Sequence, residues 1–314
     1  MITTLPIARI RLVAVAETPL LLPDYAGSTL RGAFGGALRR LACMTRQPEC
    51  PGCPLRQTCP YAVIFETAPP PEGATLQKFS EIPRPYVIEP PAWGSRRWEP
   101  GAPFHFHLVL IGRALQQLPL IMLAWQQALD RGIGAGRGRA ALHQAIWESP
   151  EGEVPVYDAA SGRTEAIATS PTNPPPQPQG VMLNFHAPLR LQQNGRALGP
   201  DQVSARTLIA ALCRRASLLE TFHGSGDPGY DFPALLDAAE SLCEHRQLQW
   251  RDWTRRSTRQ QNTMQLGGLI GRWQLEGSTA AMALLHPFLH TGQYLHVGKE
   301  ATFGMGGYRL TDAP

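Results

Sequence analysis

Residues Tyr294–Leu310 read Y-L-H-V-G-K-E-A-T-F-G-M-G-G-Y-R-L, and this stretch gives the first indication of the fold. It contains four glycines and closes in a strand-like run from Gly307 to Leu310. Because glycine has no Cβ, such a loop can adopt positive φ and approach another backbone or a phosphate closely. It is not a Walker loop, since Lys299 precedes the last glycines and a strand follows. Two interpretations remain open: a loop whose amides face phosphate, and a glycine-rich hairpin that closes a sheet.

A second glycine loop, Gly132–Arg139 (G-I-G-A-G-R-G-R), has the same local setting. Apolar periodicity predicts a helix before it, over Leu115–Asp130, and a strand after it, over Ala140–Trp147. This order is the reverse of a dinucleotide-binding motif, so we reject that interpretation. Helix, glycine loop and strand therefore occur twice, which suggests two copies of one βαββαβ unit.

The length of 314 residues accommodates two domains of about 150 residues, each able to bury its own core. Between the two copies, residues 149–179 are rich in proline, serine, threonine and glycine, which is typical of a stiff connector. We therefore predict an N-terminal domain at 1–148, a Pro-rich linker at 149–179 and a C-terminal domain at 180–314.

Periodicity also predicts the other elements. Strands are expected at Ile7–Ala16, Tyr61–Glu66, Tyr86–Glu89, Phe104–Ile111 and Val181–Leu189, helices at Ser204–Phe222, Phe232–His245 and Thr279–His290, and a hairpin at Gln247–Ser257 and Gln261–Leu275.

A helix capped by Ser28 is predicted to run to Ala42, although it contains several glycines that cost roughly 1 kcal/mol each. Something must therefore approach this helix closely. The alternatives are a neighbouring helix and an RNA backbone held by Arg31, Arg39 and Arg40.

Four of the six cysteines, Cys43, Cys50, Cys53 and Cys59, lie in one segment (43–60) that is rich in proline and glycine. Thiolates at this spacing can close a tetrahedral zinc site, and tight turns would bring them together. An iron–sulfur cluster and unliganded thiols are the alternatives. Because four protein ligands leave no open position, we assign this metal no part in catalysis.

The first arm of the predicted hairpin, W-R-D-W-T-R-R-S-T-R (Trp250–Arg259), interleaves tryptophan with arginine. Rings that stack on bases and arginines that bind phosphates suit RNA, so we predict RNA contacts by Arg255, Arg256 and Arg259. The alternative is a solvated strand whose tryptophans face the core.

The net charge is only +4, and just two of the 29 basic residues are lysines. Arginine grips phosphate bidentately, although a GC-rich genome would produce the same bias. No secretory pattern or membrane-length apolar run is present, so we expect a cytoplasmic protein without membrane contacts. In that reducing compartment, clustered cysteines favour a metal over disulfides.

Four further stretches complete the pattern: Leu30–Leu41 (L-R-G-A-F-G-G-A-L-R-R-L), Cys50–Tyr61 (C-P-G-C-P-L-R-Q-T-C-P-Y), Thr221–Gly226 (T-F-H-G-S-G) and Gln265–Gly271 (Q-L-G-G-L-I-G). Together with the two glycine loops, they resemble the CRISPR-associated RAMP-superfamily endoribonucleases that process precursor CRISPR RNA. The resemblance extends over nearly the whole chain.

This resemblance implies an α+β protein with two tandem ferredoxin-like (RRM-like) βαββαβ domains, and we place the four-cysteine metal-binding segment as an insertion in the first. It also implies binding of CRISPR repeat RNA and cleavage that needs no metal or other cofactor. The ribose 2′-hydroxyl would attack the adjacent phosphorus, leaving a 2′,3′-cyclic phosphate and a 5′-hydroxyl. The mature crRNA can stay bound, and other CRISPR effector subunits are expected as further partners.

Many relatives place a catalytic histidine in the first helix, but Ser28–Ala42 contains none. We therefore take Tyr25, Arg39, His223 and His296 as catalytic candidates, with a structural role as the alternative for both histidines. The candidates for RNA binding outside the hairpin are Arg31, Arg40, Arg137, Arg139, Lys299, Gly304 and Gly306.

Two other functions remain open at this point. The lack of a histidine in the first helix favours a non-catalytic RAMP subunit that caps crRNA in an effector complex, whereas the nearly full-length resemblance favours the processing enzyme. The third interpretation is a metal-supported RNA-binding module outside CRISPR systems.

Overall fold

The computed structural model describes residues 5–67, 82–94, 96–169, 179–256 and 263–313. These residues divide into two compact units. The N-terminal unit is built mainly from residues 5–169 and also includes Thr221–Gly226, and the C-terminal unit comprises the rest. No helix in these ranges is long and apolar enough to cross a membrane.

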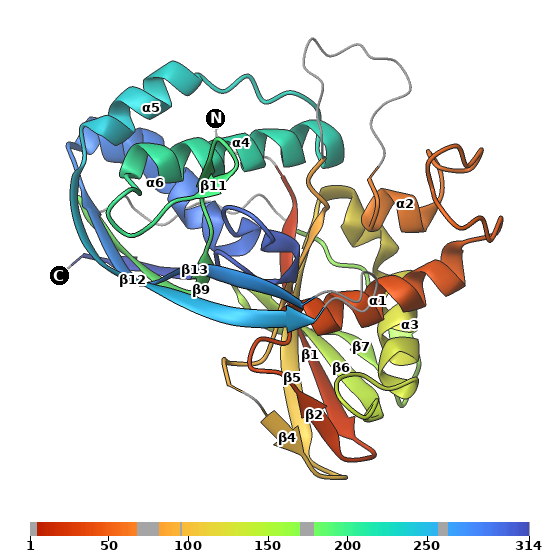
Figure 1. Cartoon of the computed structure of the whole chain (residues 1–314). Helices are drawn as coiled ribbons and strands as arrows, with labels where there is room; N and C mark the ends of the chain where they lie inside the picture. Colours follow the sequence, from red (N-terminus) through yellow and green to blue (C-terminus); the bar gives the residue numbers. More distant parts are fainter. Residues whose placement is uncertain (1–4, 68–81, 95, 170–178, 257–262, 314) are drawn as a thin grey trace. The chain divides into compact units, whose positions relative to one another are not determined.

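The N-terminal unit is an antiparallel sheet with two long helices packed against it (Figure 1). Its elements are β1 (Ile7–Ala16), α1 (Gly27–Ala42), β3 (Tyr86–Glu89), β5 (Pro103–Ile111), α3 (Leu118–Asp130) and β6 (Ala140–Ser149). The strand order is β3-β5-β1-β6, and β7 (Gly152–Asp158) and β8 (Arg163–Thr164) extend the sheet beyond β6.

Strand β1 shows how alternating side chains build this sheet. Ala8, Ile10 and Leu12 are almost completely buried in the core, whereas Arg9 and Arg11 are only half-buried. Since successive side chains of a strand point to opposite faces, the two arginines lie on the face away from the helices.

Helix α1 buries Leu30, Phe34 and other apolar residues at helical spacing. The ring of Phe34 stacks on Trp125 of α3, with the ring centroids 5.1 Å apart. A Cβ at Gly35 would collide with the ring of Phe65. Close packing inside the unit therefore explains this helix glycine without an RNA backbone.

The C-terminal unit repeats the arrangement. Its elements are β9 (Gly180–Leu189), α4 (Ala205–His223), α5 (Phe232–Glu240), β12 (Cys243–Arg256), β13 (Thr263–Glu276), α6 (Thr279–Leu295) and β14 (Tyr308–Asp312). The order β12-β13-β9-β14 corresponds strand for strand to β3-β5-β1-β6. The chain is thus an α+β protein of two tandem ferredoxin-like units, which confirms the predicted fold class.

The remaining elements of the described residues are short. They are β2 (Leu20–Leu22), α2 (Pro60–Ile64), β4 (Arg96–Trp98), η1 (Gly112–Gln117), β10 (Gln192–Gln193), β11 (Arg196–Ala197) and η2 (Ala301–Phe303).

The two glycine loops occupy equivalent places in their units. In the first, the Ala135 amide donates to the carbonyl oxygen of Leu21, just beyond β1, at 3.0 Å. In the second, the Lys299 amide donates to the carbonyl oxygen of Arg190, just beyond β9, at 2.9 Å. A Cβ at Gly298 would lie 2.5 Å from that same Arg190 oxygen, so this position needs glycine for contact with its own backbone.

Three predicted elements differ clearly from the structure. The helix predicted at Thr279–His290 extends to Leu295 as α6. Residues predicted as a strand at Tyr61–Glu66 form the short helix α2, because Pro60 occupies its first turn, where a missing amide hydrogen costs nothing. The helix predicted at Phe232–His245 ends at Glu240, because Cys243 and the residues after it pair with β13 along the hairpin.

The predicted domain boundaries of 1–148, 149–179 and 180–314 also differ from the two units. Strands β7 and β8 lie inside the predicted linker, where β7 pairs with β6 and buries Val156 and Tyr157. This short apolar pair was hidden in a proline-rich composition. In addition, Thr221–Gly226 belongs to the N-terminal unit although it lies beyond residue 180.

Candidate nucleic-acid interface

One face of the C-terminal sheet is basic and rich in amides. The strand register aligns Arg309 of β14, Asn184 of β9, Arg272 of β13 and Gln247 of β12 in one row. Residues directly opposite in antiparallel strands share a face. Asn184 is half-buried and the other three are exposed. This single row therefore offers two arginines and two amides.

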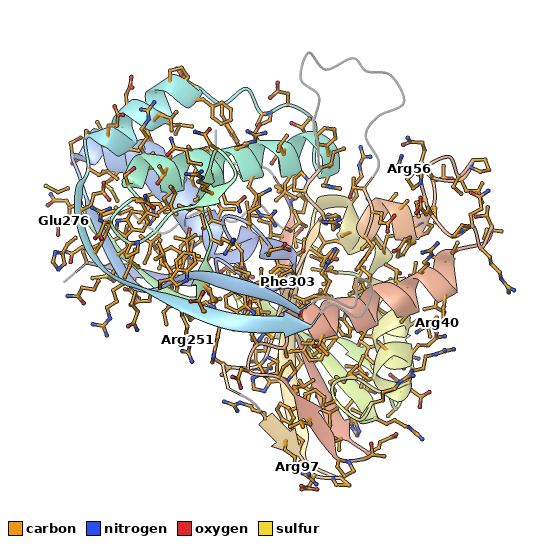
Figure 2. All side chains as sticks on the ribbon, in the orientation of Figure 1. Arg40, Arg56, Arg97, Arg251, Glu276 and Phe303 are labelled. Atoms are coloured by element: carbon orange, nitrogen blue, oxygen red, sulfur yellow. The ribbon has the colours of Figure 1, made fainter. Side chains whose placement is uncertain are left out.

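Strand β12 extends the face with the exposed residues Gln249 and Arg251. Figure 2 shows Arg251 on the side of the hairpin away from α4. The carboxylate of Glu276 lies at the other end of β13, opposite Cys243. We call this surface the basic sheet face and define it by Arg251, Arg272, Arg309, Asn184, Gln247 and Gln249.

The opposite face of the same sheet is the core of the unit. Phe185, Trp273 and Tyr308 are buried there, under α4 and α6 (Figure 1). The Tyr308 hydroxyl donates to the carbonyl oxygen of Leu289 in α6 at 2.6 Å. The helices therefore fix the sheet from one side and leave the basic side chains on the other.

The basic sheet face carries the exposed guanidinium groups of Arg272 and Arg309. Within the part of the chain that the structure describes, no ion pair joins Arg272 or Arg309 to a carboxylate. Exposed arginines without a carboxylate partner attract a polyanion, and the amides beside them can form hydrogen bonds to sugars or base edges. The surface is thus chemically suited to RNA.

The predicted hairpin contacts are only partly described. Strand β12 includes Arg255 and Arg256, whereas Arg259 lies outside the described residues. Trp250 is 36% exposed, and the guanidinium of Arg190 lies 6.0 Å from its ring centroid. The interleaved pattern thus leaves at least one ring accessible beside an arginine.

A second basic site lies in the N-terminal unit, where the structure brings together Arg40 of α1 and Arg137 of the glycine loop, both predicted to bind RNA. Desolvation and the charges of Arg131 and Arg137 lower the pKa of Arg40. Arg139 instead pairs with Glu17 at 2.9 Å. The trio Arg40, Arg131 and Arg137, which we call the arginine cluster, is a place where a phosphate would relieve repulsion.

The other two arginines of α1 make contacts inside their unit. The guanidinium of Arg31 lies 4.9 Å from the centroid of the Phe65 ring, and its Nε donates to the Tyr86 hydroxyl at 3.4 Å. Arg39 donates to the carbonyl oxygens of Gln47 and Pro48. Both side chains are half-buried, and their predicted roles at RNA stay predictions.

Three of the catalytic candidates are buried. Tyr25 is 7% exposed, and burial together with the charge of Glu89 raises its pKa well above the usual value. His223 donates from Nε2 to the carbonyl oxygen of Pro83 at 2.8 Å. His296 donates from Nδ1 to the carbonyl oxygens of Gly304 and Met305. The catalytic assignment of these residues therefore stays a prediction.

The candidates in the C-terminal glycine loop fall into two groups. The Lys299 side chain is exposed, whereas Gly304 and Gly306 are buried. The Gly306 amide donates to the carbonyl oxygen of Pro188 at 2.8 Å. Of these three candidates, Lys299 is the one whose side chain can meet a phosphate.

The four clustered cysteines line one pocket, between the end of α1 and the start of α2. Within the described ranges, no three His, Cys, Asp or Glu side chains lie close enough together to hold a metal ion. The predicted metal site thus has its ligands around a common pocket but not at coordinating distance.

The corresponding face of the N-terminal sheet has a different character. Arg9 pairs with Glu89 at 2.6 Å and also with Glu148, and Arg11 pairs with Glu153 at 2.7 Å. His107 contacts Glu148 at 3.1 Å, and burial followed by the charge of Arg9 lowers its pKa to about 4. The arginines of this face already have carboxylate partners.

Sequence analysis missed Arg272 and Arg309, although both belong to the basic sheet face. Each is a single arginine in an otherwise mixed strand, so neither forms a basic run. The signal that could have found them is the alternation within R-W-Q-L (Arg272–Leu275) and Y-R-L (Tyr308–Leu310), combined with the strand order that the βαββαβ repeat implies.

Comparison with known families adds to this picture. Residues 5–171, just over half of the chain, match the family model AF_1859_N, described as an N-terminal domain. Residues 183–308 match the model of the CRISPR-associated endoribonuclease Cas6. A search of curated protein sequences finds no match.

Solved structures show the same fold. A Cas6 (TTHB231) product complex matches with a TM-score of 0.60 and 17% identity over 97% of this chain and 100% of the other. Thermus thermophilus Cas6 (TTHB231) matches with a TM-score of 0.54 and 16% identity, over 98% and 100%. A chain of a partial Cas6-RT-Cas1–Cas2 complex matches with a TM-score of 0.59 and 14% identity, over 99% of this chain and 47% of the other.

The architecture places the chain in the class of tandem ferredoxin-like proteins. The chain belongs to the CRISPR-associated RAMP-like endoribonuclease family, with an N-terminal domain of the AF_1859_N family followed by a Cas6 domain. The family indicated by the sequence motifs is therefore confirmed.

Proposed function

We propose that this chain binds CRISPR repeat RNA and cleaves precursor crRNA by metal-independent transesterification. The 2′-oxygen of one ribose forms a bond to the adjacent phosphorus as the bond to the 5′-oxygen breaks. The products are a 2′,3′-cyclic phosphate and a 5′-hydroxyl end. The observation that carries the proposal is that the Cas6 match covers the unit that presents the basic sheet face.

The chemistry requires a base near the 2′-oxygen, an acid near the 5′-oxygen and a cation beside the phosphorane oxygens. The Tyr25 hydroxyl is protonated at neutral pH, as in an ordinary tyrosine, and its raised pKa makes it a weaker acid than usual, so in the proposal it acts as a hydrogen-bond donor and not as a base. Arg39 can supply positive charge. His223 and His296 are the remaining candidates for proton transfer, and access of RNA to them would require local opening, since both are buried.

Retention of the cleaved RNA and assembly with other CRISPR proteins are part of the same proposal. They are supported by the likeness to a Cas6 product complex and to a chain of a Cas6-RT-Cas1–Cas2 complex. We expect both activities in the cytoplasm and without a membrane partner.

The proposal is tested by incubating the purified chain with repeat RNA from its own CRISPR locus in excess EDTA. We expect one cut per repeat, with a cyclic phosphate on the upstream fragment. A matched RNA with a single 2′-deoxy residue at the mapped cut should bind equally well and remain intact, because the nucleophile is missing. Cleavage of the deoxy substrate, or a requirement for added metal, would contradict the mechanism.

The second candidate function is a non-catalytic RAMP subunit that caps crRNA. It is favoured by the absence of histidine from α1 and by the buried positions of His223 and His296. Tight binding of the repeat RNA without any cut would support it. Cleavage that is lost in the Tyr25→Phe, Arg39→Gln, His223→Asn or His296→Asn variant would support the enzyme and identify the group involved.

A further inference from the structure

The segment between α1 and α2 lacks what normally holds a protein segment in place. Residues 43–59 contain no helix or strand, and Cys50 is the buried residue among them. The two large apolar side chains of the segment, Met44 and Leu55, are 83% and 38% exposed. A stretch of this length without a core of its own usually depends on a disulfide or a metal.

The end of α1 and the start of α2 bring the last cysteine of the segment beside Ala42, the residue before Cys43. Cys43 is the residue at the C-terminal cap of α1, and Cys59 is the residue at the N-terminal cap of α2. The Cys59 sulfur lies 3.8 Å from the carbonyl oxygen of Ala42. The backbone positions of these two cysteines are therefore set by the helices that they cap.

The middle pair is arranged by a tight turn. The amide of Cys53 donates to the carbonyl oxygen of Cys50 at 3.1 Å, and the amide of Arg56 donates to the carbonyl oxygen of Cys53 at 3.1 Å. In such a turn two cysteines separated by two residues can direct both sulfurs toward one point. All four thiols line the same pocket, and all four are free of disulfides.

We infer that this pocket binds one Zn²⁺ ion through the thiolates of Cys43, Cys50, Cys53 and Cys59, and that the ion fixes the segment against the ends of α1 and α2. The thiols surround the pocket without reaching coordinating distance, so binding draws the exposed turn inward. Four thiolates on a divalent ion leave two negative charges. Arg56, which lines the pocket, and Arg39, which donates to Gln47 and Pro48, supply compensating positive charge.

This site is separate from the proposed cleavage chemistry. Four protein ligands complete a tetrahedral shell, so no position is left for water or substrate. Zinc binding is therefore independent of the proposed function, and it is measured on the protein without RNA.

The first measurement is the metal content of the full chain purified without added metal or chelator. We expect about one zinc per chain, and near zero in the Cys50→Ser and Cys53→Ser variants. The matched control is Cys243→Ser, an exposed free cysteine of β12 outside the pocket, which should keep its zinc. Absence of stoichiometric metal, or iron accompanied by visible absorption, would overturn the zinc assignment.

A second measurement uses the unaltered chain, so that a variant that fails to fold cannot obscure the result. Alkylation followed by mass spectrometry should find Cys243 reactive and the four pocket thiols protected. A mercurial, which binds those thiols in place of the metal, should release one zinc as the four pocket thiols are titrated. Alkylation of all four before zinc release, or a disulfide between any two of them, would contradict the inference.

Discussion

The open faces of the two sheets differ in how their charges are arranged, although the two units share one topology. On the N-terminal sheet, Arg9 and Arg11 are paired with carboxylates. On the C-terminal sheet, Arg272 and Arg309 lie in a row with Asn184 and Gln247. In the N-terminal copy of the fold, the arginines of the open face form ion pairs within the protein. In the C-terminal copy, the same face presents arginines that suit an external anion. The comparison teaches that strand order alone does not determine which sheet binds RNA.

Neutralising the basic sheet face should produce the largest effect. In an Arg251→Gln, Arg272→Gln, Arg309→Gln triple variant, we expect repeat RNA to bind about 3 kcal/mol more weakly, roughly 100-fold, because three phosphate contacts are lost. The slope of log affinity against log salt should become shallower by about 3. Fluorescence anisotropy titrations at several salt concentrations measure both quantities.

The control for this variant removes three exposed arginines from elsewhere in the same unit: Arg196→Gln, Arg206→Gln and Arg214→Gln. It changes the net charge equally but leaves the sheet face intact. If both triple variants bind RNA equally weakly, only overall charge matters, and the contrast between the two sheets has no functional meaning.

On the N-terminal sheet, the corresponding change should affect stability instead. Glu89→Gln removes the carboxylate that pairs with Arg9, and these side chains are only 8% and 11% exposed. We expect the free energy of unfolding to fall by about 2 to 3 kcal/mol, because a buried guanidinium loses one of its two carboxylate partners and keeps only Glu148. Chemical denaturation measures this change, and RNA affinity should be unaltered.

Glu153→Gln is the matched control on the same face. Its carboxylate pairs with Arg11 but is 57% exposed, so solvent screening should limit the loss to about 0.5 kcal/mol or less. Equal destabilisation by the two variants would show that burial does not distinguish these ion pairs.

A smaller effect is expected from His107. Its pKa is lowered to about 4 in the folded protein, against 6.5 ordinarily, so the unfolded chain binds the proton more readily. The contribution of His107 to stability is therefore complete above about pH 6.5 and falls as the pH drops toward 4, by roughly 1 to 2 kcal/mol given its coupling to Glu148. Denaturation curves across this pH range measure the slope.

Replacement by glutamine, His107→Gln, should remove this part of the pH dependence, whereas His245→Gln, at an exposed position of β12, should leave it in place. If the free energy of unfolding of His107→Gln depends on pH as steeply as that of the unaltered chain, other titratable groups cause the acid sensitivity.

Much of the fold follows from local patterns in the sequence. Strand β1 has the predicted bounds because its apolar and polar residues alternate throughout. The order of elements follows from the two glycine loops, each placed between a helix and a strand. Short elements were less predictable: α2 is only one and a half turns long, and β7 gains its place by pairing with β6 rather than from its own composition.

The candidate site could be predicted only where basic residues cluster in sequence. Arg40 and Arg137 were expected at RNA, and the structure adds Arg131, the residue at the C-terminal cap of α3, which packs against α1. Arg272 and Arg309 acquire significance only through the register that joins β13, β9 and β14. Such a site depends on which residues the pairing of strands brings side by side, and the sequence pattern of one strand does not carry that information.

The N-terminal unit is discontinuous in sequence, and this has a consequence for its synthesis. The segment Thr221–Gly226 supplies His223, whose side chain bonds to Pro83 and whose carbonyl group packs closely against Gly112. A ribosome must therefore translate well past residue 170 before the first unit can be completed. The first unit therefore cannot finish folding before part of the second unit has been synthesised. A fragment that ends before residue 180 would lack these contacts of Pro83 and Gly112.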